Sequence, residues 1–225
     1  MKRILSMLCL VIMVFSCSAM AEENTPEINF RGMKLGSTAA EVSTILSAEG
    51  SSLSLSAAHA HLSYLPKDAA YVSVSLSPAA IQNNEHNEDV ILISYTPSVE
   101  VAGHTTWTGV LCFVRPVVDG VLAENDMDSL FYAGTYALDI SAKDDLKKKL
   151  TDLYGKPEKG KHNKKECYTW YGANNTAIHM TEHNFMSNFL GLSYVWLGFD
   201  DVYQASCAYL DAQPESADAA NTAGL

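Results

Sequence analysis

The chain has 225 residues, a formal net charge of −11 and a hydrophobic fraction of 48%. This length is enough for one sizeable core or for two small ones, and the hydrophobic fraction is that of a globular protein rather than a disordered one. An acidic surface repels phosphate backbones, so we expect no nucleic-acid partner.

Residues 1–21 have the layout of a secretory signal peptide, with two basic residues, a short apolar run and then small residues. We predict cleavage between Ala21 and Glu22, which places the mature protein in the periplasm or outside the cell. The alternative is an outer-membrane lipoprotein anchored by lipid on Cys17, although Phe15 is bulky for that cleavage box. No later run approaches the roughly 20 apolar residues of a membrane helix, so we expect no integral membrane segment in the mature chain.

Residues 30–46, FRGMKLGSTAAEVSTIL, place glycines and hydroxyl residues ahead of a predicted helix that ends at Gly50. Thr38 and Glu41 match the capping box, in which each side chain accepts a hydrogen bond from the other residue's backbone N–H. The alternative, a phosphate-binding loop, requires a lysine where Ser37 stands and a parallel βαβ unit around it. We therefore expect a capped helix and no nucleotide site.

The segments after this helix alternate apolar and polar residues or are mostly apolar, as antiparallel strands are. A second helix is predicted from Ser141, as its N-cap, to Tyr154, because leucines recur at helical spacing and Gly155 follows. The segment 202–210 fits a strand or a short helix. The predicted strands cover residues 70–77, 89–95, 106–114, 128–138, 167–172, 176–180 and 190–199.

One basic cluster, KPEKGKHNKK over residues 156–165, interrupts the acidic chain. Its lysines and glycine, without apolar periodicity, indicate a solvated loop. The alternative is a local role in anion binding. The last residues, 211–225, have the small, polar composition of a disordered end.

Helices and strands do not alternate one by one along the chain, which favours an α+β fold over a doubly wound parallel sheet. We predict helices packed on one face of an antiparallel sheet. Aligning the two helices brings Val42 onto Leu146, which raises the alternative of two tandem helix-plus-strands units. These units would cover residues 22–135 and 136–210, either apart or within one compact domain.

Three cysteines follow the predicted signal peptide: Cys112, Cys167 and Cys207. Export allows a disulfide to persist. Cys112 lies in an apolar run, where we expect a small buried side chain. We predict that Cys167 pairs with Cys207, because both lie in late segments that fit neighbouring strands; the alternative is three thiols, since connectivity does not follow from sequence.

No motif in the chain carries catalysis. The nucleophile elbow of hydrolases is missing from the sequence, and Cys112 lacks the cationic, partly exposed setting of a reactive thiolate. His59 and His61 would share a strand face, and His179 and His183 have helical spacing in a segment predicted to be a strand that runs into a loop. Neither pair has an evident third ligand, so we expect no catalytic, metal or cofactor site.

Four aromatic residues suggest a binding surface. Tyr168 and Trp170 share one face of a predicted strand, and Tyr194 and Trp196 share one face of a later strand. Paired across a sheet, they would form an aromatic platform of the kind that dominates protein interfaces. The alternative is that the same residues form the core beneath the helices, where most large aromatic residues lie.

The segment GMKLGSTAAEVSTIL resembles the start of the repeat in small bacterial envelope proteins of the outer-membrane assembly lipoprotein (BamE, SmpA/OmlA) and β-lactamase-inhibitor-protein types. The run LKKKLTDLYGKPEKG, followed by CYTWYG and TAIHM, is similar to a second such unit, and the match covers roughly residues 30–46 and 141–180. The resemblance implies helices on one face of an antiparallel sheet, no catalysis, and binding of another protein through the sheet or loops.

We therefore expect an exported bacterial envelope protein that acts without catalysis as a protein-binding or assembly-support module. Its partner is expected to be another envelope protein. The alternative is a hydrolase or small-ligand-binding protein whose site is assembled from loops and leaves no motif.

Overall fold

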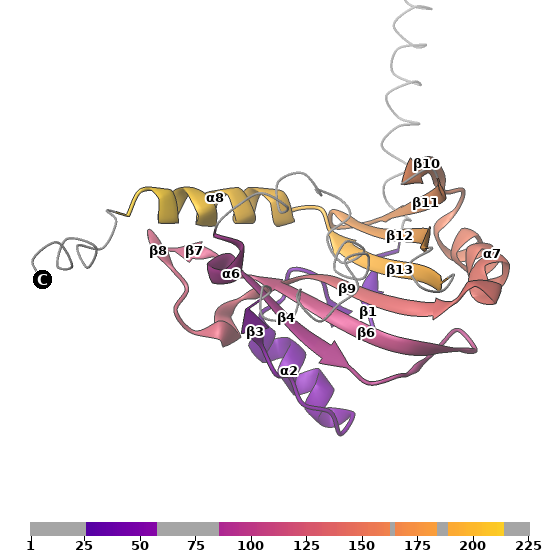
Figure 1. The fold of residues 1–225 in the computed structure, drawn as a ribbon, viewed down its shortest axis with the longest axis horizontal. Coiled ribbons are helices and arrows are strands. Elements are labelled where there is room, and N and C mark those ends of the chain that lie inside the picture. Colours follow the sequence, from indigo (N-terminus) through magenta and orange to yellow (C-terminus); the bar gives the residue numbers. More distant parts are fainter. Residues whose placement is uncertain (1–25, 58–85, 163–164, 184–188, 214–225) are drawn as a thin grey trace, which may run out of the picture.

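The computed structural model of the chain describes residues 26–57, 86–162, 165–183 and 189–213. Its centre is an antiparallel sheet of nine strands, flanked by helices (Figure 1). This arrangement agrees with the predicted α+β class. The strands of the sheet are β3 (Ser56–Ala57), β4 (Ile91–Thr96), β5 (Glu100–Val101), β6 (His104–Val114), β9 (Leu130–Asp139), β10 (Glu158–His162), β11 (Lys165–Gly172), β12 (Thr176–His183) and β13 (Phe189–Trp196).

Short hairpins and helices complete the described structure. Two two-stranded hairpins are formed by β1 (Asn29–Phe30) with β2 (Met33–Lys34) and by β7 (Val117–Val118) with β8 (Val121–Leu122). The helices are α2 (Ala39–Ala48), α6 (Asn87–Val90), α7 (Lys143–Tyr154) and α8 (Phe199–Asp211), with 3₁₀ turns η1 (Asp126–Asp128) and η2 (Ile140–Ala142).

Eight of the nine strands form two groups of four neighbours, and the ninth, β5, pairs with the start of β6. The spatial order is β10-β11-β12-β13-β9-β6-β4-β3, so the last strand of each group, β13 and β9, pair in the middle. One group follows α2 in the chain, and the other follows α7. The predicted boundary between residues 135 and 136 falls inside β9, so one continuous sheet joins the two predicted units.

The first helix begins as the capping pattern predicts. The β1–β2 hairpin turns through Arg31 and Gly32, both with positive φ (55° and 76°), as a tight two-residue turn requires. Thr38 then accepts a hydrogen bond from the backbone N–H of Glu41, and the Glu41 carboxylate accepts one from that of Thr38. This confirms the predicted capping box and gives the polar residues of the segment a structural role.

The second helix starts later than predicted. Ser141 is not its N-cap but lies in the 3₁₀ turn η2, and α7 begins at Lys143. The carboxylate of Asp139 accepts a hydrogen bond from the Ser141 backbone N–H at 2.9 Å, so the acidic residue caps the turn instead. Gly155 ends α7 with φ of 80°, as predicted.

The helices cover both faces of the sheet. Neighbouring strand residues point to opposite faces, and Leu111 belongs to one buried cluster while Val110 belongs to another. Val42 of α2 and Leu146 of α7 pack in the first cluster, whereas Tyr203 of α8 packs in the second. We call these sides the α2/α7 face and the α8 face. The expectation that all helices share one face is therefore wrong for α8, the segment whose sequence fits a strand or a short helix.

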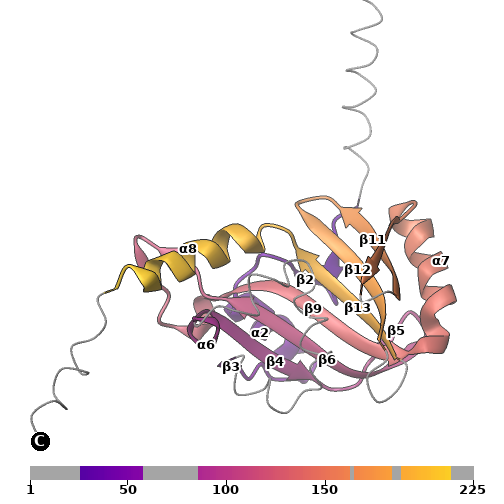
Figure 2. The ribbon, with the colours of Figure 1, turned by 45° about the horizontal axis from the view of Figure 1, so that its top comes forward.

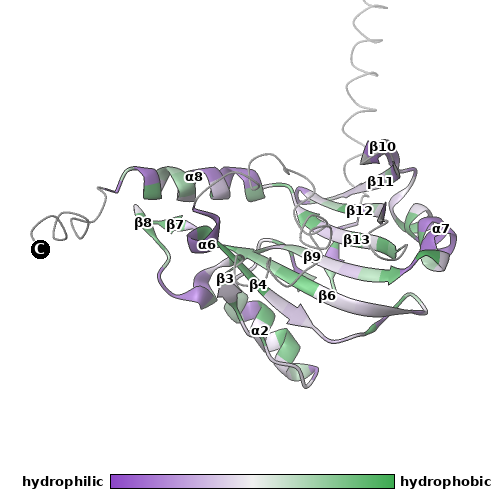
Figure 3. Cartoon of the chain, viewed as in Figure 1, coloured by the Kyte–Doolittle hydropathy of each residue, from purple (hydrophilic) through white to green (hydrophobic). Residues whose placement is uncertain are grey.

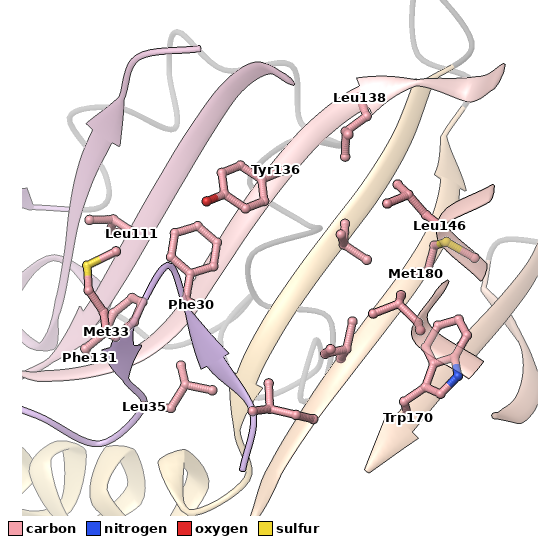
Figure 4. Packing of buried hydrophobic residues seen from close by; sticks show 14 of the residues in the cluster. Phe30, Met33, Leu35, Leu111, Phe131, Tyr136, Leu138, Leu146, Trp170 and Met180 are labelled. Atoms are coloured by element: carbon pink, nitrogen blue, oxygen red, sulfur yellow. The ribbon is translucent and has the colours of Figure 1, made fainter. Parts of the chain in front are cut away.

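The core of the α2/α7 face is built around β1 (Figure 4). This strand lays the Phe30 ring across β9, where it stacks on Tyr136 with centroids 4.5 Å apart. Gly134 makes room for the ring, because a Cβ at this position would lie 2.4 Å from it. Burial of a Phe side chain contributes about 1.5–3 kcal/mol, so this contact helps to hold β1 on the sheet.

The predicted disulfide between Cys167 and Cys207 is not formed. The structure has Cys112, Cys167 and Cys207 as buried thiols. Cys207 lies on α8, which packs near β6 and the β7–β8 hairpin, whereas Cys167 lies on β11, four strands from β6 in the sheet. Four strand spacings amount to roughly 19 Å, well beyond the span of a disulfide.

Several sequence predictions lie outside the described residues. They are the signal peptide with its cleavage site at Ala21 and Glu22, the lipid-anchor alternative at Cys17, the strand over 70–77, His59 with His61, and the tail beyond residue 213.

Candidate binding surfaces

The four predicted platform residues lie together on the α2/α7 face of the sheet. Trp170 and Tyr194 flank Ile178 in directly opposed positions of β11, β12 and β13. Tyr168 and Trp170 are only 3% and 1% exposed, and Tyr194 and Trp196 pack against the same core. The structure therefore places Tyr168 and Trp170 in the core, where α7 packs over β11. Tyr194 and Trp196 are partly buried instead by the N-terminal segment, because the Phe30 ring lies 5.4 Å from that of Tyr194 and Gly36 packs against Trp196. The four residues therefore do not form an exposed platform.

Cations of α7 cover the rim of this core. The Lys147 ammonium lies 4.0 Å from the centroid of the Tyr168 ring, and that of Lys143 lies 5.7 Å away. The Tyr168 hydroxyl donates a hydrogen bond to Glu166 at 2.6 Å. Lys143 also forms an ion pair with Glu182 of β12. The aromatic residue thus connects the buried core to a charged surface.

The basic segment 156–165 is not a solvated loop throughout. It contains β10, which pairs with β11 in antiparallel register. Lys159 lies directly opposite Tyr168, and Lys161 lies opposite Glu166, so both lysines occupy the α2/α7 face. The fold therefore brings two lysines of β10 beside two of α7, in the hydrophilic region around β10 and α7 (Figure 3). We call Lys143, Lys147, Lys159 and Lys161 the lysine cluster.

The groups around Glu166 favour their charged forms. The Tyr168 hydroxyl, and then Lys143, Lys159 and Lys147, lower the pKa of the Glu166 carboxyl. The hydrogen bond to Glu182 raises the pKa of Lys143. The α2/α7 face of this edge thus combines four cations with two carboxylates, whereas Glu158 of β10 lies on the opposite face with Tyr171. This face therefore keeps a local positive charge on an acidic protein.

β10 is also the last strand of the sheet at this side. Among the described strands only β11 pairs with it, and β11 lies beyond β13 and β12 at this end of the sheet (Figure 2). Residues 158–161 are all exposed. Gly160 sits at its centre, where a Cβ would lie 2.9 Å from the Cys167 sulfur. The outer edge therefore presents backbone N–H and C=O groups to solvent, with lysines on either side of the glycine.

A polar row crosses the α8 face of the same half of the sheet. Thr169, His179, Ser193 and Thr135 are directly opposed on four neighbouring strands. Hydrogen bonds join Thr169 Oγ1 to His179 Nδ1 at 3.0 Å and Thr135 Oγ1 to Ser193 Oγ at 3.1 Å. A hydroxyl beside an imidazole is the chemistry of an activated nucleophile, and here that hydroxyl belongs to Thr169. His179 is only 8% exposed and Ser193 is fully buried, so most of the row lies inside the packed sheet. The row satisfies polar groups within the packed sheet.

The histidine pair of the later segment does not converge. His179 and His183 both lie on β12, a strand, where four residues span roughly 13 Å. The described residues hold no group of three His, Cys, Asp or Glu side chains that would bind a metal ion.

Sequence reasoning missed β10. Its only local indication is the alternation of Lys159 and Lys161 around Gly160, which is a period of two without apolar residues. Lysines are frequent on edge strands because they discourage unwanted pairing, so this alternation is compatible with a strand. The pairing with β11 is what distinguishes it from a loop.

Comparison with protein-family models, with curated proteins and with solved structures finds no match to this chain. Within the part of the chain that the structure describes, no helix has the length and apolarity needed to cross a membrane. The function is therefore inferred from the surfaces of the molecule itself.

Proposed function

We propose that this chain is an exported bacterial envelope protein that binds another protein, and that the outer edge of β10 is its binding surface. The exposed terminal strand carries this proposal. An edge strand offers a row of backbone donors and acceptors to which an extended segment adds as one more strand. The signal-peptide layout of residues 1–21 supports export.

The topology supports a further part of the same proposal, namely that the chain contains two related helix-plus-strands units. One is α2 with β3, β4, β6 and β9, and the other is α7 with β10 to β13. Both helices pack in the same hydrophobic cluster, and the last strands of the two groups pair antiparallel. A duplicated unit related by a two-fold rotation would have this arrangement, in line with the resemblance to envelope proteins built from repeats.

Site-specific photo-crosslinking in the native host tests the binding surface. A benzoylphenylalanine replaces Glu158, which is exposed on β10 and lies outside the lysine cluster, in one variant. The matched control carries it at Val118, a residue 55% exposed in the β7–β8 hairpin. We expect a discrete adduct with one envelope protein from position 158 and none from position 118.

Two results would contradict the proposal. The first is an absence of adducts from position 158 while the chain is folded and exported. The second is turnover in a broad hydrolase substrate screen, which would favour the loop-built enzyme instead.

A further inference from the structure

We propose that the segment that docks on β10 is an extended acidic segment of the partner protein, with carboxylates at every second residue. This inference rests on the proposed function and specifies the chemistry of the partner. The lysine cluster determines that chemistry, because it gathers cations of α7 and β10 at one sheet edge. These cations are far from obvious neighbours in the sequence alone.

The charges of the lysine cluster first determine which sign of charge the peptide carries. The cluster contains four lysines, and the carboxylates of Glu166 and Glu182 balance two of them. The chain as a whole has a net charge of −11, so an acidic segment is repelled elsewhere and attracted here. Such complementarity gives register and specificity to an encounter.

The register then determines which residues of the peptide lie beside the lysines. Lys159 and Lys161 point to the α2/α7 face, so residues i and i+2 of an added strand lie beside them. The residue between them faces the other side of the sheet, where Gly160 has no side chain. An acidic–variable–acidic pattern therefore matches this edge, with cross-strand carboxylate–ammonium pairs on one face only.

The same lysines argue against a second copy of this chain as the occupant. Antiparallel pairing of β10 with β10 would set Lys159 and Lys161 against one another, and like charges directly opposite are destabilising. Carboxylates on the added strand remove this repulsion. The cluster therefore disfavours self-pairing and favours an acidic strand.

Fluorescence anisotropy with the purified full chain tests the inference. The probe is a labelled ten-residue peptide that alternates glutamate with threonine, and the controls replace glutamate by lysine, or replace alternate threonines by proline. We expect binding of the acidic peptide only, since proline removes the backbone N–H that strand addition needs. Adding salt should weaken binding.

Charge reversal identifies the surface. The double variant Lys159→Glu, Lys161→Glu should bind the acidic peptide at least about tenfold more weakly, because attraction becomes repulsion at two positions. The control Lys34→Glu, Lys148→Glu changes the net charge equally at exposed lysines outside the cluster and should keep the affinity. Circular dichroism and thermal unfolding verify that both variants are folded.

Three outcomes would overturn the inference: equal binding of the proline peptide, equal losses in the two double variants, or stronger binding of phosphatidylglycerol vesicles than of the acidic peptide. The last would identify an anionic membrane surface instead. If the crosslink from position 158 persists in the Lys159→Glu, Lys161→Glu variant, protein binding stands and only the acidic chemistry is wrong. If neither form gives an adduct, the proposed function itself fails.

Discussion

The ring of Phe30 lies directly on the backbone of Gly134, so that a Cβ on this glycine would approach the ring to 2.4 Å. Phe30 of β1 is fully buried against β9, and its ring also stacks on that of Tyr136. Gly134 is thus a packing requirement, since the close approach of an aromatic ring leaves no volume for a methyl group.

Gly134→Ala should lower the free energy of unfolding by about 1–3 kcal/mol through overpacking. Chemical denaturation measures this change. In a double-mutant cycle with Phe30→Leu, the alanine should cost less, because the smaller side chain leaves room for it. Additive losses would show that the contact between residues 30 and 134 does not cause the effect.

The capping box of α2 gives a second prediction. Thr38→Ala should destabilise the protein by about 1 kcal/mol, because the Glu41 backbone N–H loses its side-chain acceptor. Thr44→Ala is the matched control: the Thr44 hydroxyl bonds back to the Ala40 carbonyl inside the same helix, where alanine is the better helix former. Thermal unfolding should show a lower midpoint for Thr38→Ala only. Equal shifts would contradict the cap.

The contribution of the hydrogen bond between Tyr168 and Glu166 to stability should depend on pH. This bond is the largest cause of the lowered pKa of Glu166. Because the folded pKa lies below the unfolded one, the bond stabilises the fold above the ordinary glutamate pKa and ceases to do so as the pH falls through the folded pKa.

Tyr168→Phe should therefore raise the pKa of Glu166, as followed by carboxyl NMR titration. The difference in stability between wild type and this variant should shrink on acidification. Tyr171 lies on β11 like Tyr168, and its hydroxyl donates a hydrogen bond to Glu158 of β10. Tyr171→Phe is therefore the matched control and should leave the pKa of Glu166 unchanged. A difference in stability that is independent of pH would attribute the loss to packing alone.

The cysteines should behave as buried thiols. Burial raises the pKa of the Cys167 thiol, so little thiolate forms at neutral pH. Iodoacetamide should leave the native chain largely unmodified and should alkylate Cys112, Cys167 and Cys207 after unfolding without reductant, as measured by intact mass. If Cys167 and Cys207 were alkylated only after reduction, the disulfide predicted from the sequence would be present after all.

Local features of the fold follow from the sequence because the interactions that define them span only a few residues. The capping box lies within the first turn of α2, and the glycine that ends α7 acts through its own φ. The central strands β4, β6, β9, β11, β12 and β13 are visible as apolar or alternating runs at nearly the observed positions.

The position of Ser141 shows the limit of such local reasoning. Its hydroxyl makes it a good N-cap candidate, but the chain leaves β9 in a 3₁₀ turn that Asp139 caps, and this delays the start of α7. Strand β9 ends where its pairing with β13 ends, at Asp139 opposite Phe189. A contact across 50 residues thus decides where the helix begins.

The candidate surface itself depends on the tertiary structure. An alternating pattern shows that Tyr168 and Trp170 share a face, but only the packing of α7 shows that this face is buried. Likewise, Lys159 and Lys161 belong to a strand because β11 pairs with them, and they share a face with Lys147 because α7 packs over Tyr168 of the same sheet. The sequence by itself determined the helices α2 and α7, most strands and the acidic balance, through interactions between near neighbours. Which face is covered, which edge stays open and which charges converge were decided by contacts between segments far apart in the chain.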